Sequence, residues 1–103
     1  MENNLLQRIK QSVEKTAPGA IVIYYGSGAR GDANAASDID ILILVNTDKV
    51  SYADEKKIKY PLYDIEFESG KIISPLVLSK KQWEGQHSIT PFYANVKNDG
   101  ILL

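Results

Sequence analysis

The run at residues 38–45, Asp-Ile-Asp-Ile-Leu-Ile-Leu-Val, constrains the fold more than any other part of the chain. It is short and β-branched, and it begins polar and ends fully apolar, which is typical of a β-strand. Residues 20–25, Ala-Ile-Val-Ile-Tyr-Tyr, predict a second, buried strand. The two strands predict a small sheet whose apolar faces other elements must cover.

The segments around these strands predict helices and one further strand. Residues 2–16 predict an amphipathic helix, because their apolar residues follow an i, i+4 spacing and Pro18-Gly19 ends it. Residues 49–69 fit two patterns. Side chains at 63–68 alternate as in a half-buried strand, whereas positions 58, 62, 65 and 69 form one helical stripe before Gly70, a suitable helix C-cap. We favour the helix, because residues 71–79 fit the strand that such a helix would lead into; Pro75 places that strand at a sheet edge or a bulge.

The rest of the chain predicts short elements. Residues 26–34 predict a loop, with room for one helical turn, and residues 79–83 predict a helical turn. Thr90 and Pro91 form a good N-cap and first-turn pair for a final helix that ends at Gly100. The order helix, strand, strand, helix, strand, helix predicts one α/β (α+β) domain over residues 1–103, a two-layer fold with helices packed on a small mixed sheet.

Composition limits the functions that this chain can have. With 12 basic and 13 acidic residues the net charge is −1, so we expect no strong general nucleic-acid binding. The chain has no cysteine, which fits a cytoplasmic protein, and residues 1–4 lack the features of a signal peptide. Apolar runs such as 41–45 are too short to cross a membrane, so we expect no membrane association.

Asp38 and Asp40 form the first half of a candidate site. On a strand they point to the same side, with their Cα atoms about 6.5 Å apart. Two carboxylates this close repel unless a cation neutralises them. Hard oxygen ligands suit Mg²⁺, or Mn²⁺ in its place, with water and phosphate oxygens completing the coordination shell.

The loop Gly26-Ser27-Gly28-Ala29-Arg30-Gly31 forms the second half. Its glycines let several backbone N–H groups converge on a phosphate, while Ser27 adds a hydroxyl and Arg30 a guanidinium group. A phosphate-binding loop and a metal-binding acid pair on consecutive strands are the two parts that phosphoryl transfer from a nucleoside triphosphate needs.

The fuller pattern, Gly26-Ser27, ten residues, then Asp38-Ile39-Asp40, resembles the minimal nucleotidyltransferases of the DNA polymerase β superfamily. That group includes the antitoxin halves of HEPN–MNT toxin–antitoxin pairs. The resemblance implies that Gly26 and Ser27 contact the triphosphate and that Asp38 and Asp40 are the catalytic, metal-binding acids. Arg30 matches a basic position of the family's glycine loop.

The sequence departs from the family at two points. The residue after the Gly-Ser pair is often arginine in relatives and is Gly28 here. Active members also carry a third carboxylate on a later strand. If that strand is 71–79, the expected position falls near Ser74; the acids at 64, 66 and 68 would serve only if 63–68 were the strand. Those acids are Asp64, Glu66 and Glu68.

The resemblance leads to two functional hypotheses. The first is a Mg²⁺-dependent enzyme that transfers a nucleoside monophosphate, with AMP from ATP as the expected case, to a hydroxyl of a protein or small molecule. The second is a catalytically degenerate module that binds a nucleotide or covers a partner such as a HEPN ribonuclease. The small size leaves little room to bind an acceptor, so we expect a partner chain or self-association under either hypothesis.

Overall fold

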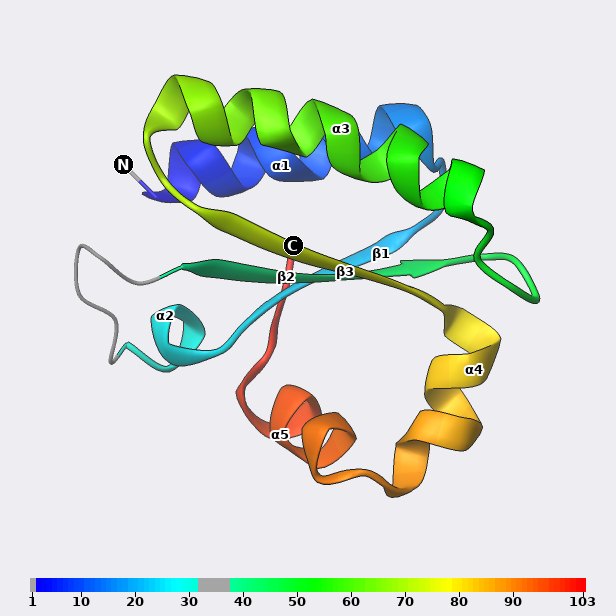
Figure 1. Ribbon diagram of the computed structural model, residues 1–103. Helices are drawn as coiled ribbons and strands as arrows, with labels where there is room; N and C mark the ends of the chain where they lie inside the picture. The colour runs from blue at the N-terminus through cyan, green and yellow to red at the C-terminus, as the bar shows by residue number, and fades with distance from the viewer. Residues whose placement is uncertain (1, 32–37) are drawn as a thin grey trace.

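The sheet is built around β2 (Ile39–Val45), which lies between β1 (Ile21–Tyr25) and β3 (Ile73–Ser79) (Figure 1). This computed structural model describes residues 2–31 and 38–103. The strand order is β3-β2-β1-β4, where β4 is Ile101–Leu102. β2 is parallel to β3, whereas β1 is antiparallel to both β2 and β4, so the sheet is mixed as predicted. Every residue of β2 except Asp40 is buried, because the strand has neighbours on both sides and helices above both faces.

Two long helices, α1 (Glu2–Thr16) and α3 (Tyr52–Ser69), lie side by side on one face of the sheet (Figure 1). The apolar stripe of α1 packs with that of α3 on the odd-numbered residues of β2, since alternate side chains of a strand share a face. The central buried side chains of this layer are Ile9, Val13, Ile41, Ile43, Ile58 and Leu62.

The opposite face of the sheet is covered by α4 (Lys80–Glu84), the 3₁₀-helix η1 (Gln86–Ile89) and α5 (Pro91–Asp99) (Figure 1). Trp83 is only 1% exposed and packs with Leu42, Leu44 and Val96. The predicted class, a small mixed sheet with helices packed on it, is confirmed. The predicted fold had two layers, whereas the structure has three, because these short C-terminal helices cover the second face of the sheet.

The ambiguous segment 49–69 is a helix, as predicted. Ser51 caps α3 in a reciprocal arrangement: its hydroxyl accepts a hydrogen bond from Asp54 N, and the Asp54 carboxylate accepts one from Ser51 N. Gly70 adopts a left-handed conformation with φ +73° at the C-cap. Residues 63–68 therefore do not form a strand. Of the apolar side chains that alternate with acids in this segment, only Ile65 is buried in the helix.

The C-terminal elements follow the prediction with two additions. β3 is an edge strand, which accommodates Pro75. The helices predicted at 79–83 and 90–100 are α4 and α5. The Thr90 hydroxyl caps α5 by accepting a hydrogen bond from Tyr93 N. The sequence did not predict η1 or β4, which are too short to leave a periodic pattern. Within residues 2–31 and 38–103, no helix is long and apolar enough to cross a membrane.

Candidate functional site

The site begins where β1 turns into a short helix. Gly26 follows β1 directly and has φ +84° and ψ −162°, a backbone conformation that only glycine adopts at low cost. The next residues form α2 (Ser27–Arg30), so the predicted loop does contain a helical turn. Residues 32–34 of that predicted loop lie outside the described part of the chain.

Gly26 lies against the Asp40 carboxylate. Asp40 pairs with Tyr25 in the antiparallel register of β1 and β2, and this register places it beside the residue that follows Tyr25. A Cβ atom built at Gly26 would lie 3.3 Å from Asp40 Cγ and closer still to Oδ2. The two halves of the predicted site, which are far apart in the sequence, therefore meet at one point of the structure.

The electrostatics of this point are those of a crowded acid pair. Burial raises the pKa of Asp40, the nearby Asp38 raises it further, and Arg30 acts in the opposite direction. Asp38 lies at the exposed end of the strand, directly before β2. Arg30 is thus close enough to stabilise negative charge here, whether it belongs to Asp40 or to a phosphate.

Tyr25 is a site neighbour that the sequence patterns did not indicate. Burial raises the pKa of the Tyr25 phenol, and the negative charge of Asp40 raises it further. Its ring packs edge-to-face on Phe92 of α5, with centroids 5.3 Å apart. The available signal was its position directly before Gly26; its pairing with Asp40 depends on the register of β1 and β2.

The donor set fits one hard divalent cation. Asp38 and Asp40 supply two carboxylates at the start of one strand, and after burial the charge of Asp38 is the next cause that raises the pKa of Asp40, with Arg30 offsetting part of it. Mg²⁺ commonly takes one or two protein carboxylates and fills its other positions with water and substrate phosphates. Asp38 and Asp40 are therefore the residues that would hold it.

A third carboxylate is absent from the strand that would carry it. Ser74 pairs with Asp40 in the parallel register of β2 and β3, and its hydroxyl donates a hydrogen bond to Asp38 Oδ2 at 3.3 Å. The structure thus places Ser74 beside the acid pair, and a third carboxylate at this position stays a prediction. Within residues 2–31 and 38–103, no group of three or more His, Cys, Asp or Glu side chains is placed to bind a metal.

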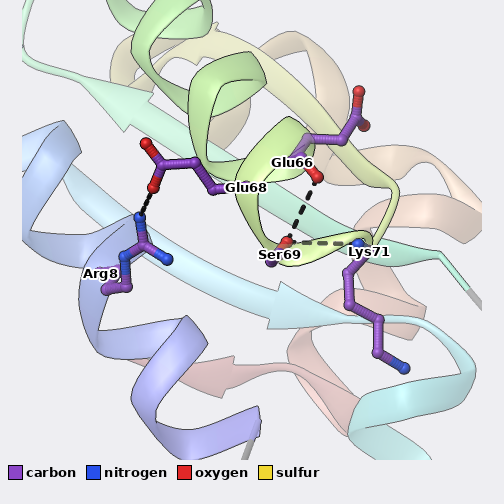
Figure 2. A network of polar contacts seen from close by, with 5 residues as sticks. All are labelled: Arg8, Glu66, Glu68, Ser69 and Lys71. Carbon is purple, nitrogen blue, oxygen red and sulfur yellow. Dashed lines mark hydrogen bonds and ion pairs between the residues drawn. The ribbon is translucent and has the colours of Figure 1, made fainter.

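Two of the candidate acids of α3, Glu66 and Glu68, have structural contacts instead (Figure 2). Glu68 forms an ion pair with Arg8 of α1, and the Glu66 carbonyl accepts a hydrogen bond from the Ser69 hydroxyl. The Glu66 carboxylate accepts a hydrogen bond from Ile73 N at 2.8 Å, on the face of the sheet opposite Ser74. Asp64 is exposed on the same helix. With 63–68 in a helix, none of the three acids replaces the missing carboxylate.

The other departure from the family, Gly28, has a steric reason. A Cβ atom at this position would lie 2.7 Å from Tyr24 Cζ and closer still to the hydroxyl oxygen. Tyr24 is 4% exposed and belongs to the core beneath α1 and α3, so its ring cannot move aside cheaply. The space that an arginine side chain would use to leave α2 is therefore occupied by Tyr24.

Comparisons with known proteins agree with this geometry. The profile of the family described as "Nucleotidyltransferase domain" matches residues 6–89, which include both halves of the site. No curated protein matches the chain. One similar solved structure is a toxin–antitoxin with AMP-PNP, at TM-score 0.63 and 16% identity, covering 93% of this chain and 69% of that one. Another, from Sulfolobus solfataricus, is provisionally assigned as a nucleotidyltransferase, at TM-score 0.60 and 23% identity, covering 96% of this chain and 76% of that one.

These two structures share the fold, while the family match also covers the Gly-Ser loop and the acid pair. The chain therefore belongs to the nucleotidyltransferase domain family.

Proposed function

We propose that the chain binds a nucleoside triphosphate with Mg²⁺ and transfers its nucleoside monophosphate to a hydroxyl group, with ATP as the expected donor. One observation carries the proposal: the backbone of Gly26 lies against the carboxylate of Asp40. This contact joins the loop that would hold the phosphates to the acids that would hold the cation. A nucleoside triphosphate with its metal needs both at the same place.

Each residue of the site has a distinct role in the proposed reaction. The Ser27 hydroxyl and the Arg30 guanidinium bind and orient phosphate oxygens, and Asp38 and Asp40 hold Mg²⁺. When bound, Mg²⁺ neutralises charge on the triphosphate. The acceptor hydroxyl gives up its proton to a base outside β3 and its oxygen forms a bond to the α-phosphorus; the bond from that phosphorus to the bridging oxygen breaks, and pyrophosphate leaves. Since nucleoside triphosphates are intracellular metabolites, we place the reaction in the cytoplasm.

Ser74 favours a second candidate function, nucleotide binding without transfer. Ser74 pairs with Asp40 and its hydroxyl donates to Asp38 Oδ2, and a carboxylate in its place would accept the proton of the attacking hydroxyl. A chain with this substitution would still bind a nucleotide and one cation. The toxin–antitoxin neighbour with AMP-PNP supports both a nucleotide and a protein partner, for which a HEPN-type ribonuclease is our candidate.

The test uses ATP labelled at the α-phosphate, with ATP labelled at the γ-phosphate as a parallel sample. The protein is incubated with Mg²⁺, alone and with the product of its neighbouring gene, and protein-bound label is counted. Transfer of α-label but not γ-label is expected from nucleotidyl transfer. The variant Asp38→Ala/Asp40→Ala should abolish it, whereas Asp64→Ala, an exposed acid outside the site, should not change it.

A binding assay separates the two candidates. If ATP binds only with Mg²⁺ but no label is transferred, the binding-only function is supported, and Ser74→Asp becomes the variant that should restore transfer. If ATP with Mg²⁺ does not bind the wild-type chain, or binds it as well after Asp38 and Asp40 are removed, both candidates are wrong.

A further inference from the structure

Helix α3 carries a stripe of exposed aromatic side chains on its outer side. The stripe consists of Tyr52, Tyr60, Tyr63 and Phe67, which are 68%, 56%, 42% and 91% exposed. Their spacings of eight, three and four residues keep them within one narrow arc of the helix. Large exposed apolar patches of this kind are uncommon on monomeric proteins and mark interaction surfaces.

The stripe points away from the rest of the molecule. The buried residues of α3 are Ile58, Leu62 and Ile65, which face the sheet and α1. At about 100° per residue, the aromatic arc lies on nearly the opposite side of the helix. Figure 1 shows α3 beside α1 on one side of the sheet, with no described segment above it. The aromatic contacts lie within the helix itself: Tyr60 meets Tyr63 at 6.2 Å between centroids, and Lys56 lies over the Tyr52 ring.

Charge along α3 changes sign from one half of the helix to the other. The first half, residues 52–60, carries lysines at 56, 57 and 59 against acids at 54 and 55, a net charge of +1, and the second half, residues 61–69, carries acids at 64, 66 and 68, a net charge of −3. Lys57 and Asp64 flank the aromatic stripe and are both exposed. Among residues 2–31 and 38–103, neither side chain has an ion pair.

Lys57 and Asp64 cannot satisfy each other within one helix. They are seven residues apart, so they lie on the same side of α3 but about 10.5 Å apart along its axis. A second α3 that runs antiparallel along the stripe would place its Asp64 beside Lys57 and its Lys57 beside Asp64. A two-fold axis forms both pairs at once, because the same flank of each helix faces its copy.

We propose that the aromatic stripe of α3 is a self-association surface, on which a second copy of this chain packs through its own α3 in antiparallel orientation. Charge complementarity identifies a second copy as the partner, because Lys57 and Asp64 of one α3 meet opposite charges on another α3 only when the two helices are antiparallel. This proposal is independent of the proposed catalytic function, since α3 packs on the face of the sheet opposite Asp40 and Ser74.

The size of the surface sets the expected strength. An 18-residue helix is about 27 Å long, so a pair of such helices buries less than the roughly 1,200–2,000 Å² of a stable complex. We therefore expect a reversible dimer, populated at tens to hundreds of micromolar protein, and not a permanent one.

Sedimentation velocity from about 5 to 500 µM tests the aromatic part of the proposal, because a dissociation constant of roughly tens to hundreds of micromolar lies within this range. The wild-type chain should shift from monomer toward dimer, and Phe67→Ser should weaken association at least about tenfold. Ile89→Ser is the matched control, because Ile89 is 89% exposed but lies on η1 below the sheet; it should leave association unchanged. Both sites are exposed, and circular dichroism checks that each variant is folded.

Charge exchange tests the antiparallel orientation. Lys57→Glu and Asp64→Lys should each weaken the dimer, and the double variant Lys57→Glu/Asp64→Lys should restore it, because both intermolecular pairs are then reversed together. A chain that stays monomeric up to about 500 µM overturns the proposal, whether or not a different protein binds α3. A dimer that resists Phe67→Ser, or single charge variants that the double variant does not rescue, also overturns it.

Discussion

Replacing Gly26 with alanine is the most direct test of the contact on which the site depends. The substitution introduces two separate costs. The backbone at φ +84° and ψ −162° becomes strained for any residue with a Cβ atom, and that atom overlaps the Asp40 carboxylate. Both costs arise at the meeting point of the phosphate loop and the acid pair, so stability and ligand binding should change together.

The magnitude follows from the two costs. A non-glycine residue in this backbone region costs about 1–3 kcal/mol, and forcing a methyl group into a filled space costs about 1–3 kcal/mol more. We therefore expect Gly26→Ala to lower the free energy of unfolding by about 2–6 kcal/mol. For a chain of this size each kcal/mol lowers Tm by about 4–8 °C. Gly70→Ala is the matched control, because Gly70 also has positive φ, but a Cβ atom added to it would meet no other atom within 4 Å.

Urea unfolding and calorimetric titration with ATP and Mg²⁺ measure the two effects. Gly70→Ala should cost about 1–2 kcal/mol, the cost of a left-handed conformation for a residue with a Cβ atom, and leave nucleotide affinity unchanged. In an Asp40→Ala background the overlapping carboxylate is gone, so Gly26→Ala should cost only the free energy of its strained backbone. The loss of unfolding free energy caused by Gly26→Ala in the wild-type chain, minus the loss in this background, measures the steric conflict between the new methyl group and Asp40. The reasoning is refuted if Gly26→Ala unfolds like wild type, or if its cost is the same with and without Asp40.

Three further substitutions test other parts of the structure. Gly28→Ala should destabilise the chain by about 1–3 kcal/mol in urea unfolding despite alanine's helix preference, because Tyr24 fills the space; a stabilised variant would contradict the packing. The raised pKa of Asp40 means that its contribution to stability is complete below the unfolded-state pKa and is lost as the pH rises through the folded-state pKa. Asp40→Asn should therefore raise Tm at neutral pH without Mg²⁺, with the gain fading towards about pH 4; equal Tm values at neutral pH would count against this. Ser79→Ala should lower the free energy of unfolding in urea by about 1–3 kcal/mol, and Ser51→Ala by about 1 kcal/mol. The larger loss is expected because the buried Ser79 hydroxyl both donates to the Thr47 carbonyl and caps α4. A larger loss for Ser51→Ala would contradict this.

Much of the fold was predictable because each long element has a strong local signal. The apolar run of β2 and the spacing of α1 are unambiguous patterns, and Gly70 ends α3 as a left-handed cap. Tertiary features were not predictable in this way. The burial of Trp83 under the sheet depends on α4 and α5 folding back together, and β4 forms only because Ile101 and Leu102 meet the free edge of β1.

The sequence pattern named the residues of the candidate site but not the contacts between them. The sequence identified Gly26 and Asp40 as parts of one pattern, but only the register of β1 and β2 brings one against the other. The steric conflict at Gly28 was likewise hidden, because Tyr24 is a core residue by every sequence criterion and its hydroxyl reaches α2 only in the folded chain.

The missing third acid cannot be recovered by a small shift of β3. A slip of one residue would turn every side chain of the strand to the other face and expose Ile73 and Val77, which are buried against α1 and α3. A slip of two residues would leave each side chain on its present face of the sheet but bring Ile72 or Leu76 opposite Asp40. No slip of this strand can supply an acid, because residues 71–79 contain none. The apolar pattern that fixes the fold therefore also fixes Ser74 in place. If this chain transfers a nucleotide, the group that accepts the proton has to come from outside β3. The acceptor or a bound partner would supply it, which is why the labelled-ATP experiment includes the product of the neighbouring gene.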